Sequence, residues 1–438
     1  MYIEDYEISL CHREGNEYMK RAHIQTYLVI LMLIMLTVNC SIIGSHGLLN
    51  KKLSFNPVRV TIFNPDAEDE LVIYTHDSFL AWGLDPETTR QIAFDDFGVD
   101  NGISIKLIEF SGMVDALNTL ITQKNNPQAD IVIGLDNVMV SRAKEEHILQ
   151  KYSEVDLSNI NSSLVNSLDP DKYLLPIDFG LIAIIFDTEF INTTSFPELN
   201  QLTFEDLATT FVNDLAVQDP TLSSTGINFL LYQIAFYEQI LKQDWTIWWQ
   251  SVKKEITIDE SWSDSWDRVF SAKEAHMMVS YGTDPAYNAY FNYSEEKNAA
   301  IFEYNSEKYG WMQIEGIGIV NGTSKKDLAE KFIDYALNDT FQDLIALNNW
   351  MFPANQEVIL PEDYTNFAIT TENVTVLNYQ VSSEYINQNY LTWLNEWEQL
   401  IYGKGYWWIW VLIPSIIILA GLIITGYIYF RKKRLDIE

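Results

Sequence analysis

Several polar residues of this chain are candidates for binding a small solute. Each follows a run of apolar residues, and their imidazole, hydroxyl, carboxylate and backbone N–H groups can donate or accept hydrogen bonds. The candidates are His76, Asp77, Ser111, Gly112 and Asp136. The aspartates can also offset a positive charge, so the expected ligand is polar and its charge is positive.

Aromatic residues form a second group of candidates. Trp262, Tyr281, Tyr287 and Trp350 lie in stretches that read as loops or strand ends. Aromatic rings in such places either pack against the protein or bind a ligand, and stacking or cation–π contact with a flat cation contributes about 1–2 kcal/mol each. Both interpretations, ligand binding and packing, stay open for each ring.

Ser223 and Ser224 precede a long helical pattern, and this position has two interpretations. Serine is a common N-cap, because its hydroxyl accepts a hydrogen bond from the first turn of the helix. The same turn has free N–H groups that can bind an anion or a hydroxyl. The two roles are compatible.

The sequence contains none of the motifs that would indicate catalysis or metal binding. There is no His-Glu-x-x-His pair, no Gly-x-Ser-x-Gly and no Walker lysine loop. The only cysteines, Cys11 and Cys40, precede the main body. We therefore expect a protein that is not an enzyme, with no catalytic residue, metal site or cofactor. The net charge of -33 argues against nucleic-acid binding.

The elements that must position these residues alternate between strands and helices. Strands are predicted at 71–75, 103–109 and 129–135, with helices at 86–97 and 112–122 between them. This alternation indicates an α/β lobe with a parallel sheet, in which ligands bind beyond the carboxyl ends of the strands. Further strands are predicted at 181–186, 215–217, 277–281 and 315–320, and further helices at 227–241, 247–254, 325–337 and 341–347.

The two ends of the chain contain apolar segments. Residues 406–430 have the length and lack of charge of a transmembrane helix, and basic residues follow at 431–434. Residues 27–38 match a signal-peptide core or a second anchor. These segments predict a single-pass protein of the cell membrane, or a two-pass protein if the first segment is retained, with the binding domain outside the cell. Asn-x-Ser/Thr sequences such as that at Asn161 are compatible with a glycoprotein.

Taken in order along the chain, several motifs resemble those of the periplasmic thiamine-binding proteins of bacterial ABC importers. The match runs from about residue 71 to about residue 400. It rests on the motifs at 74–79, 129–137, 176–180, 218–226, 280–287 and 349–353. Together these motifs are far more specific than any one of them alone.

The resemblance implies a type II periplasmic-binding-protein fold, which is α/β and has two lobes with the ligand between them. Lobe 1 would comprise 55–178 and 282–400, and lobe 2 would comprise 179–281. The apolar segments at the two ends, and not the resemblance, predict the remaining parts: an N-terminal extension with signal peptide or anchor (1–50), a C-terminal transmembrane helix (406–430) and a cytoplasmic tail (431–438). All the candidates above would line a site for thiamine or a related cation. An ABC permease and ATPase would be the partners of a monomeric domain.

Some residues depart from the family pattern. His76 replaces a tyrosine, Ser111 an aspartate and Thr225 a proline. The lost aspartate at position 111 removes a partner for the ligand. The alternatives are therefore a binder of another cation such as a polyamine, or a ligand-sensing ectodomain that works with a partner. Ferric-binding relatives use adjacent tyrosines, which are missing from this sequence.

Overall fold

The computed structural model describes residues 57–152, 156–293, 298–381 and 383–403. The signal peptide or anchor predicted within 1–50, the membrane helix predicted at 406–430 and the tail at 431–438 lie outside these residues. Among the helices of the described ranges, none is both long enough and apolar enough to cross a membrane.

The first hydrophobic core forms around parallel strands. Strands β2 (Asp69–His76), β3 (Ile103–Phe110) and β4 (Ile131–Asp136) are parallel, and β1 (Arg59–Phe63) pairs antiparallel with β3 at the edge of the sheet. Their apolar runs are buried, as expected for a sheet that is covered on both faces. The parallel sheet predicted for this part of the chain is therefore confirmed.

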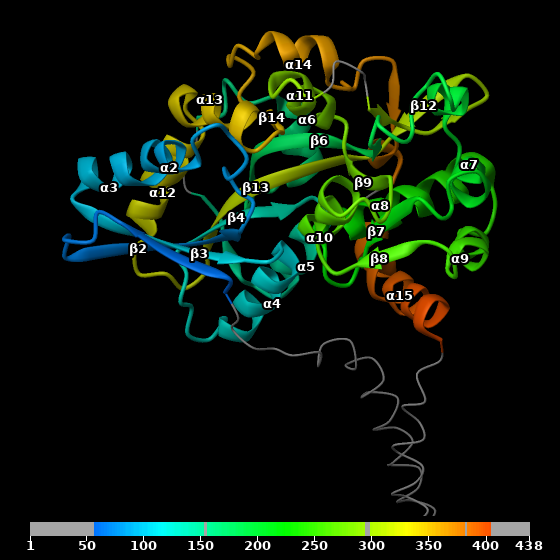
Figure 1. The fold of residues 1–438 in the computed structure, drawn as a ribbon. Helices are drawn as coiled ribbons and strands as arrows, with labels where there is room; N and C mark the ends of the chain where they lie inside the picture. Colours follow the sequence, from blue (N-terminus) through cyan, green and yellow to red (C-terminus); the bar gives the residue numbers. More distant parts are fainter. Residues whose placement is uncertain (1–56, 153–155, 294–297, 382, 404–438) are drawn as a thin grey trace, which may run out of the picture. The chain divides into compact units, whose positions relative to one another are not determined.

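Helices cover this part of the sheet (Figure 1). The pattern predicted at 86–97 forms one nearly continuous run with a π-helical turn in its middle. The helices of this part are α2 (Pro86–Arg90), η2 (Gln91–Asp95), α3 (Asp96–Asn101), α4 (Met113–Gln123), α5 (Val140–Glu145), α6 (Ser162–Leu168), α12 (Lys326–Ala336) and α13 (Asp339–Asn348).

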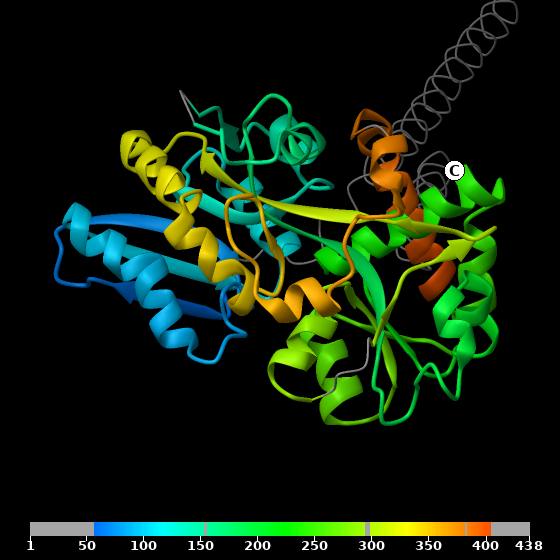
Figure 2. The same ribbon diagram turned by 90° about the horizontal axis from the view of Figure 1, so that it is seen from above.

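Two long antiparallel strands, β6 (Leu175–Phe186) and β13 (Met312–Val320), link the first core to a second one, to which Trp311 directly before β13 belongs. Leu175 at the start of β6 packs in the first core, whereas Ile184 near its end packs in the second. Figures 1 and 2 show both strands running between the two halves of the described chain. They are the structural link between the two cores.

The second core surrounds another group of strands. β9 (Met277–Tyr281) pairs antiparallel with β6, and β7 (Leu215–Gln218) is parallel to both β9 and β8 (Thr257–Asp259). The helices of this part are α7 (Phe204–Thr209), α8 (Ser224–Ala235), η4 (Phe236–Leu241), α9 (Thr246–Val252), α10 (Trp262–Trp266), η5 (Asp267–Ser271) and α15 (Ser383–Tyr402). The long helix predicted at 227–241 is thus α8 continued by the π-helical turn η4.

The C-terminal part of the described chain contributes to the second core. Trp393 and Trp397 of α15 are buried there, and the Trp397 ring meets the ring of Trp249 edge-on at 5.6 Å. Trp311 belongs to the same core. The lobe boundaries predicted from the sequence assign these residues to lobe 1, whereas they pack with the residues predicted for lobe 2.

Short elements complete the described chain. They are β5 (Leu149–Gln150), η3 (Pro197–Gln201), α11 (Asp284–Tyr290), β10 (Ala299–Ala300), β14 (Phe352–Pro353), α14 (Glu362–Phe367) and η6 (Leu377–Gln380), with a small sheet of β11 (Glu303–Tyr304), β12 (Glu307–Gly310) and β15 (Val374–Val376). A third cluster of apolar side chains, which includes Trp350 and Tyr364, packs around α11 and α14.

Candidate solute-binding site

A cavity lies between residues of the two cores. Its volume is about 830 Å³, which includes space open to solvent. The lining residues are His76, Ser78, Trp82, Ser111, Gly112, Met113, Ser223, Ser224, Thr225, Trp262, Trp266, Tyr281, Asp284, Tyr287, Glu315, Asn349, Trp350 and Met351. All the predicted ligand-binding residues except Asp77 and Asp136 are in this set.

Asp77 and Asp136 lie outside the cavity lining. The backbone of Asp77 continues the β2–β3 pairing, since its N–H donates to the carbonyl of Phe110. Asp136 is fully buried and accepts a 2.6 Å hydrogen bond from Nδ2 of Asn228 in α8. Burial raises the pKa of Asp136 to about 7, although this hydrogen bond opposes the shift. Asp136 therefore joins β4 to α8 across the two cores.

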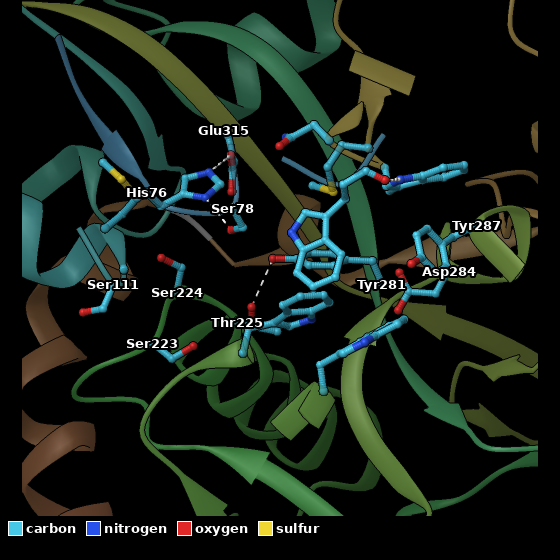
Figure 3. A pocket seen from close by; sticks show the side chains of 18 residues that line it. His76, Ser78, Ser111, Ser223, Ser224, Thr225, Tyr281, Asp284, Tyr287 and Glu315 are labelled. Atoms are coloured by element: carbon cyan, nitrogen blue, oxygen red, sulfur yellow. Dashed lines mark hydrogen bonds and ion pairs between the residues drawn. The ribbon is translucent and has the colours of Figure 1, made fainter. Parts of the chain in front are cut away.

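One end of the cavity is formed by the first turns of α4 and α8. Ser223 is the N-cap of α8, and its Oγ accepts a hydrogen bond from the N–H of Gly226. Gly112 is the N-cap of α4 and makes no side-chain capping bond. Figure 3 shows Ser111, Ser223 and Ser224 on the same side of the cavity. Helix N-termini attract negative charge, so this end favours an anionic or hydroxyl group.

His76 and Glu315 form the second polar part of the site. Nε2 of His76 lies 3.4 Å from Oε2 of Glu315, and its Nδ1 lies 2.8 Å from Oγ of Ser78 (Figure 3). Burial lowers the pKa of His76, but the adjacent Glu315 carboxylate outweighs this effect and the net pKa is raised.

Gly134 of β4 makes room for the His76 ring. Its φ is +101°, and a Cβ at this position would lie 2.9 Å from Cδ2 of His76. A larger residue here would combine backbone strain with displacement of the ring.

Aromatic rings line the opposite end of the cavity. Trp262 and Trp266 stack at 5.2 Å between ring centroids, and Trp82 meets Trp262 edge-on at 5.2 Å. Tyr287 lies edge-on to Trp350 at 5.0 Å and to Trp266 at 5.5 Å. Since Trp82 packs against residues of α10, the aromatic walls come from both sides of the cavity.

Trp350 has an unusual backbone conformation for a large residue. Its φ of +54° lies in the left-handed region, which is rare for side chains of this size. Its Nε1 donates to the carbonyl of Trp82 at 2.9 Å, and its own carbonyl accepts a 2.6 Å hydrogen bond from Oγ1 of Thr283. These bonds fix the ring in the wall of the cavity.

A buried carboxyl group lies beside these rings. Asp284, the first residue of α11, is 4% exposed. Burial raises its pKa to about 7, although hydrogen bonds from the Ser280 side chain and the Tyr281 backbone oppose the shift. Its Oδ2 has no hydrogen-bond partner among the described residues.

Sequence reasoning missed some of the lining residues. Trp266 follows Trp262 by one helical turn, so an i, i+4 pattern could have placed both rings on one face. Glu315 is an acidic residue within the buried strand β13, and a charge in such a strand is a signal for a site. Trp262 and Tyr287, which were predicted in loops, lie in the short helices α10 and α11.

Comparison with known proteins identifies relatives that bind thiamine. Residues 126–374 match the family described as bacterial extracellular solute-binding protein. The thiamine-binding periplasmic protein of Escherichia coli is 27% identical, with 76% of this chain and 94% of the relative covered. That of Brucella abortus is 28% identical, with 76% and 92% covered. These relatives are binding proteins by name.

The same comparison corrects the predicted localisation. The relatives are periplasmic proteins by name. The prediction of a single-pass or two-pass protein of the cell membrane is therefore contradicted. It rested on apolar segments that lie outside the described residues.

Solved structures agree on the fold. A periplasmic thiamin binding protein has a TM-score of 0.63 at 25% identity, covering 76% of this chain and 96% of that one. A ferric binding protein from Campylobacter jejuni has a TM-score of 0.57 at 20% identity, with 76% and 98% covered, and shares the fold. The α/β periplasmic-binding-protein fold with two lobes is thus confirmed. By this match of sequence and fold, the chain belongs to the family of bacterial extracellular solute-binding proteins.

Proposed function

We propose that this protein captures thiamine or a thiamine phosphate in the cavity between its two lobes. The observation that carries the proposal is the pairing of an aromatic enclosure with carboxyl groups in one cavity. Thiamine has two flat rings and a fixed positive charge. Aromatic walls suit the rings, and Asp284 and Glu315 suit the charge.

The polar end of the cavity supports the inclusion of thiamine phosphates. The first turns of α4 and α8 both face this end, with Ser111 and Ser224 among the lining residues. Helix N-termini bind phosphate groups through backbone N–H groups. The cavity therefore has one end suited to a cation and another suited to an anion.

The predicted site residues that line the cavity remain part of this proposal, whereas Asp77 and Asp136 do not line it. Asp136 would act by holding β4 to α8 through Asn228. We also propose that the lobe boundary follows the two cores, so that α15 belongs to lobe 2. Delivery of the solute to an ABC permease and ATPase is the corresponding transport step.

A polyamine is the second candidate ligand. Aromatic rings and carboxyl groups also suit a flexible polycation, and this cavity contains both. The relatives named for thiamine favour the first candidate. A ligand-sensing protein that works with a partner would use the same cavity.

Equilibrium competition distinguishes these ligands. The full-length protein is mixed with equal amounts of thiamine, thiamine monophosphate, thiamine diphosphate and spermidine, and the retained solute is identified by native mass spectrometry. We expect one thiamine-type molecule per chain. Retention of spermidine alone would reject thiamine as the ligand and favour the polyamine.

A further inference from the structure

Asp284 is a buried carboxyl group with one unused oxygen in the wall of the cavity. The side chain is almost fully buried, and its Oδ2 has no hydrogen-bond partner among the described residues. Burying an acceptor without a partner is unfavourable, because the group loses its hydrogen bonds to water. An oxygen that stays unpaired in a binding cavity is explained most simply by a ligand that supplies the missing donor.

The surroundings of Asp284 connect it to the aromatic wall. Nε1 of Trp262 donates to Oγ of Ser280 at 2.9 Å, and the Ser280 side chain is hydrogen-bonded to Asp284. Tyr287 lies one turn further along α11 and lines the same cavity. Figure 3 shows Asp284 beside Tyr281 and Tyr287, on the opposite side of the cavity from Ser111 and Ser223.

A purely structural role does not account for this carboxyl group. Thr283, not Asp284, is the N-cap of α11, and α11 has only 7 residues. No lysine or arginine forms an ion pair with Asp284 within the described ranges. The titratable groups that interact with it are Tyr287 and Tyr364, and neither of them supplies a positive charge.

We propose that Asp284 determines the specificity of the cavity, because its Oδ2 accepts a hydrogen bond from an N–H group of a nitrogenous cation held by Trp262, Tyr287 and Trp350. Solutes that present an N–H donor there bind well, and solutes of the same shape that present an acceptor bind poorly. This inference rests on the proposed function in that it assumes a thiamine-like solute in the cavity. The raised pKa of Asp284 fits the proposal, since an incoming cation would favour the ionised carboxylate.

Calorimetric titration of the full-length protein with thiamine and oxythiamine tests the proposal. Oxythiamine carries an oxo group in place of the amino group of the pyrimidine ring. We expect the wild-type protein to prefer thiamine by about 10- to 100-fold, the range for loss of a hydrogen bond to a charged group. Asp284→Asn should weaken thiamine binding by a similar factor and reduce the preference, because the amide can donate to the oxo group.

Asp267→Asn is the matched control. It removes one carboxylate from an exposed position on the neighbouring turn η5, outside the cavity lining. It should keep the preference of the wild-type protein. If Asp284→Asn melts at or above the wild-type temperature and still prefers thiamine to the same extent, the proposal is overturned while the proposed function stands.

A protein that binds neither ring compound would refute the proposed function instead. Spermidine then replaces them as the probe, because its amines also present N–H donors. Loss of spermidine binding in Asp284→Asn but not in Asp267→Asn would support the role of Asp284. Equal spermidine binding by the two variants, or no spermidine binding by the wild-type protein, would overturn the role proposed for Asp284.

Discussion

At the scale of residues, the described part of the chain contains carboxyl groups whose protonation is set by burial. Asp136 and Asp284 each have a pKa raised to about 7. The pKa of Asp178 is also raised well above its usual range, first by burial and then by the charge of Glu315. The folded protein thus binds protons on these groups more tightly than the unfolded chain does. Stability should therefore fall as pH rises between the two pKa values.

Asp284→Asn should remove the part of this pH-dependent loss of stability that comes from Asp284. For Asp284 the pKa rises from 3.8 to about 7, so its cost to stability is absent below about pH 4, grows as pH rises and reaches about 4 kcal/mol above pH 7 as an upper estimate. The variant should therefore be more stable than the wild-type protein at about pH 8 and similar to it at about pH 4. Denaturant unfolding at both pH values measures the difference. If the variant and the wild-type protein are equally stable at both pH values, the carboxyl group of Asp284 is not buried in its protonated form.

Trp266 provides a prediction about the aromatic wall. Trp266→Leu removes the ring that stacks on Trp262, and an aromatic pair contributes about 0.5–1.5 kcal/mol. The affinity for thiamine should fall by roughly 2- to 10-fold. Trp266→Phe is the matched control and should retain most of the affinity. If Trp266→Leu and Trp266→Phe lower the affinity for thiamine equally, ring stacking at this position does not contribute to binding.

At the scale of elements, β4 and α8 are joined by one buried hydrogen bond from Asn228 to Asp136. A hydrogen bond to a charged group contributes about 1.5–3 kcal/mol. Because this bond links the two cores beside the cavity, Asn228→Ala should weaken thiamine binding by about 10-fold or more although residue 228 does not line the cavity. A double-mutant cycle with Asp136→Ala, read by calorimetry, isolates the coupling. Additive effects of the two substitutions would exclude this role.

Most of the elements that carry the site could be predicted from the sequence. The buried runs of β2, β3, β4 and β9 are short, apolar and bounded by polar residues, so their ends placed His76 and Ser111 correctly at the cavity. The short helices α10 and α11 were missed because their few residues show no clear helical period.

Tertiary pairing explains the other omissions. β13 pairs with β4 although they lie more than a hundred residues apart in the chain, and β4 pairs with β2, so that Glu315 comes close to His76. No local pattern contains that information. Similarly, Asp136 was predicted to face the ligand because it follows a strand, but the packing of α8 turns it toward Asn228.

At the scale of the whole molecule, the net charge of -33 favours cationic solutes. Salt screens such interactions, with a Debye length of about 10 Å at 0.1 M. The affinity for thiamine should therefore decrease as ionic strength rises, and the affinity for the anionic thiamine diphosphate should decrease less or increase. Calorimetric titrations at low and high salt measure both trends. The same trend for both ligands would show that the net charge of the protein does not affect selection.

The central claim is that the cavity between the two cores holds the solute, and a crystal structure of the protein with thiamine tests it most directly. We expect the rings of thiamine between Trp262, Tyr287 and Trp350, with an N–H group of the ligand hydrogen-bonded to Asp284. Thiamine bound elsewhere on the protein, or an empty cavity at saturating thiamine, would contradict the account.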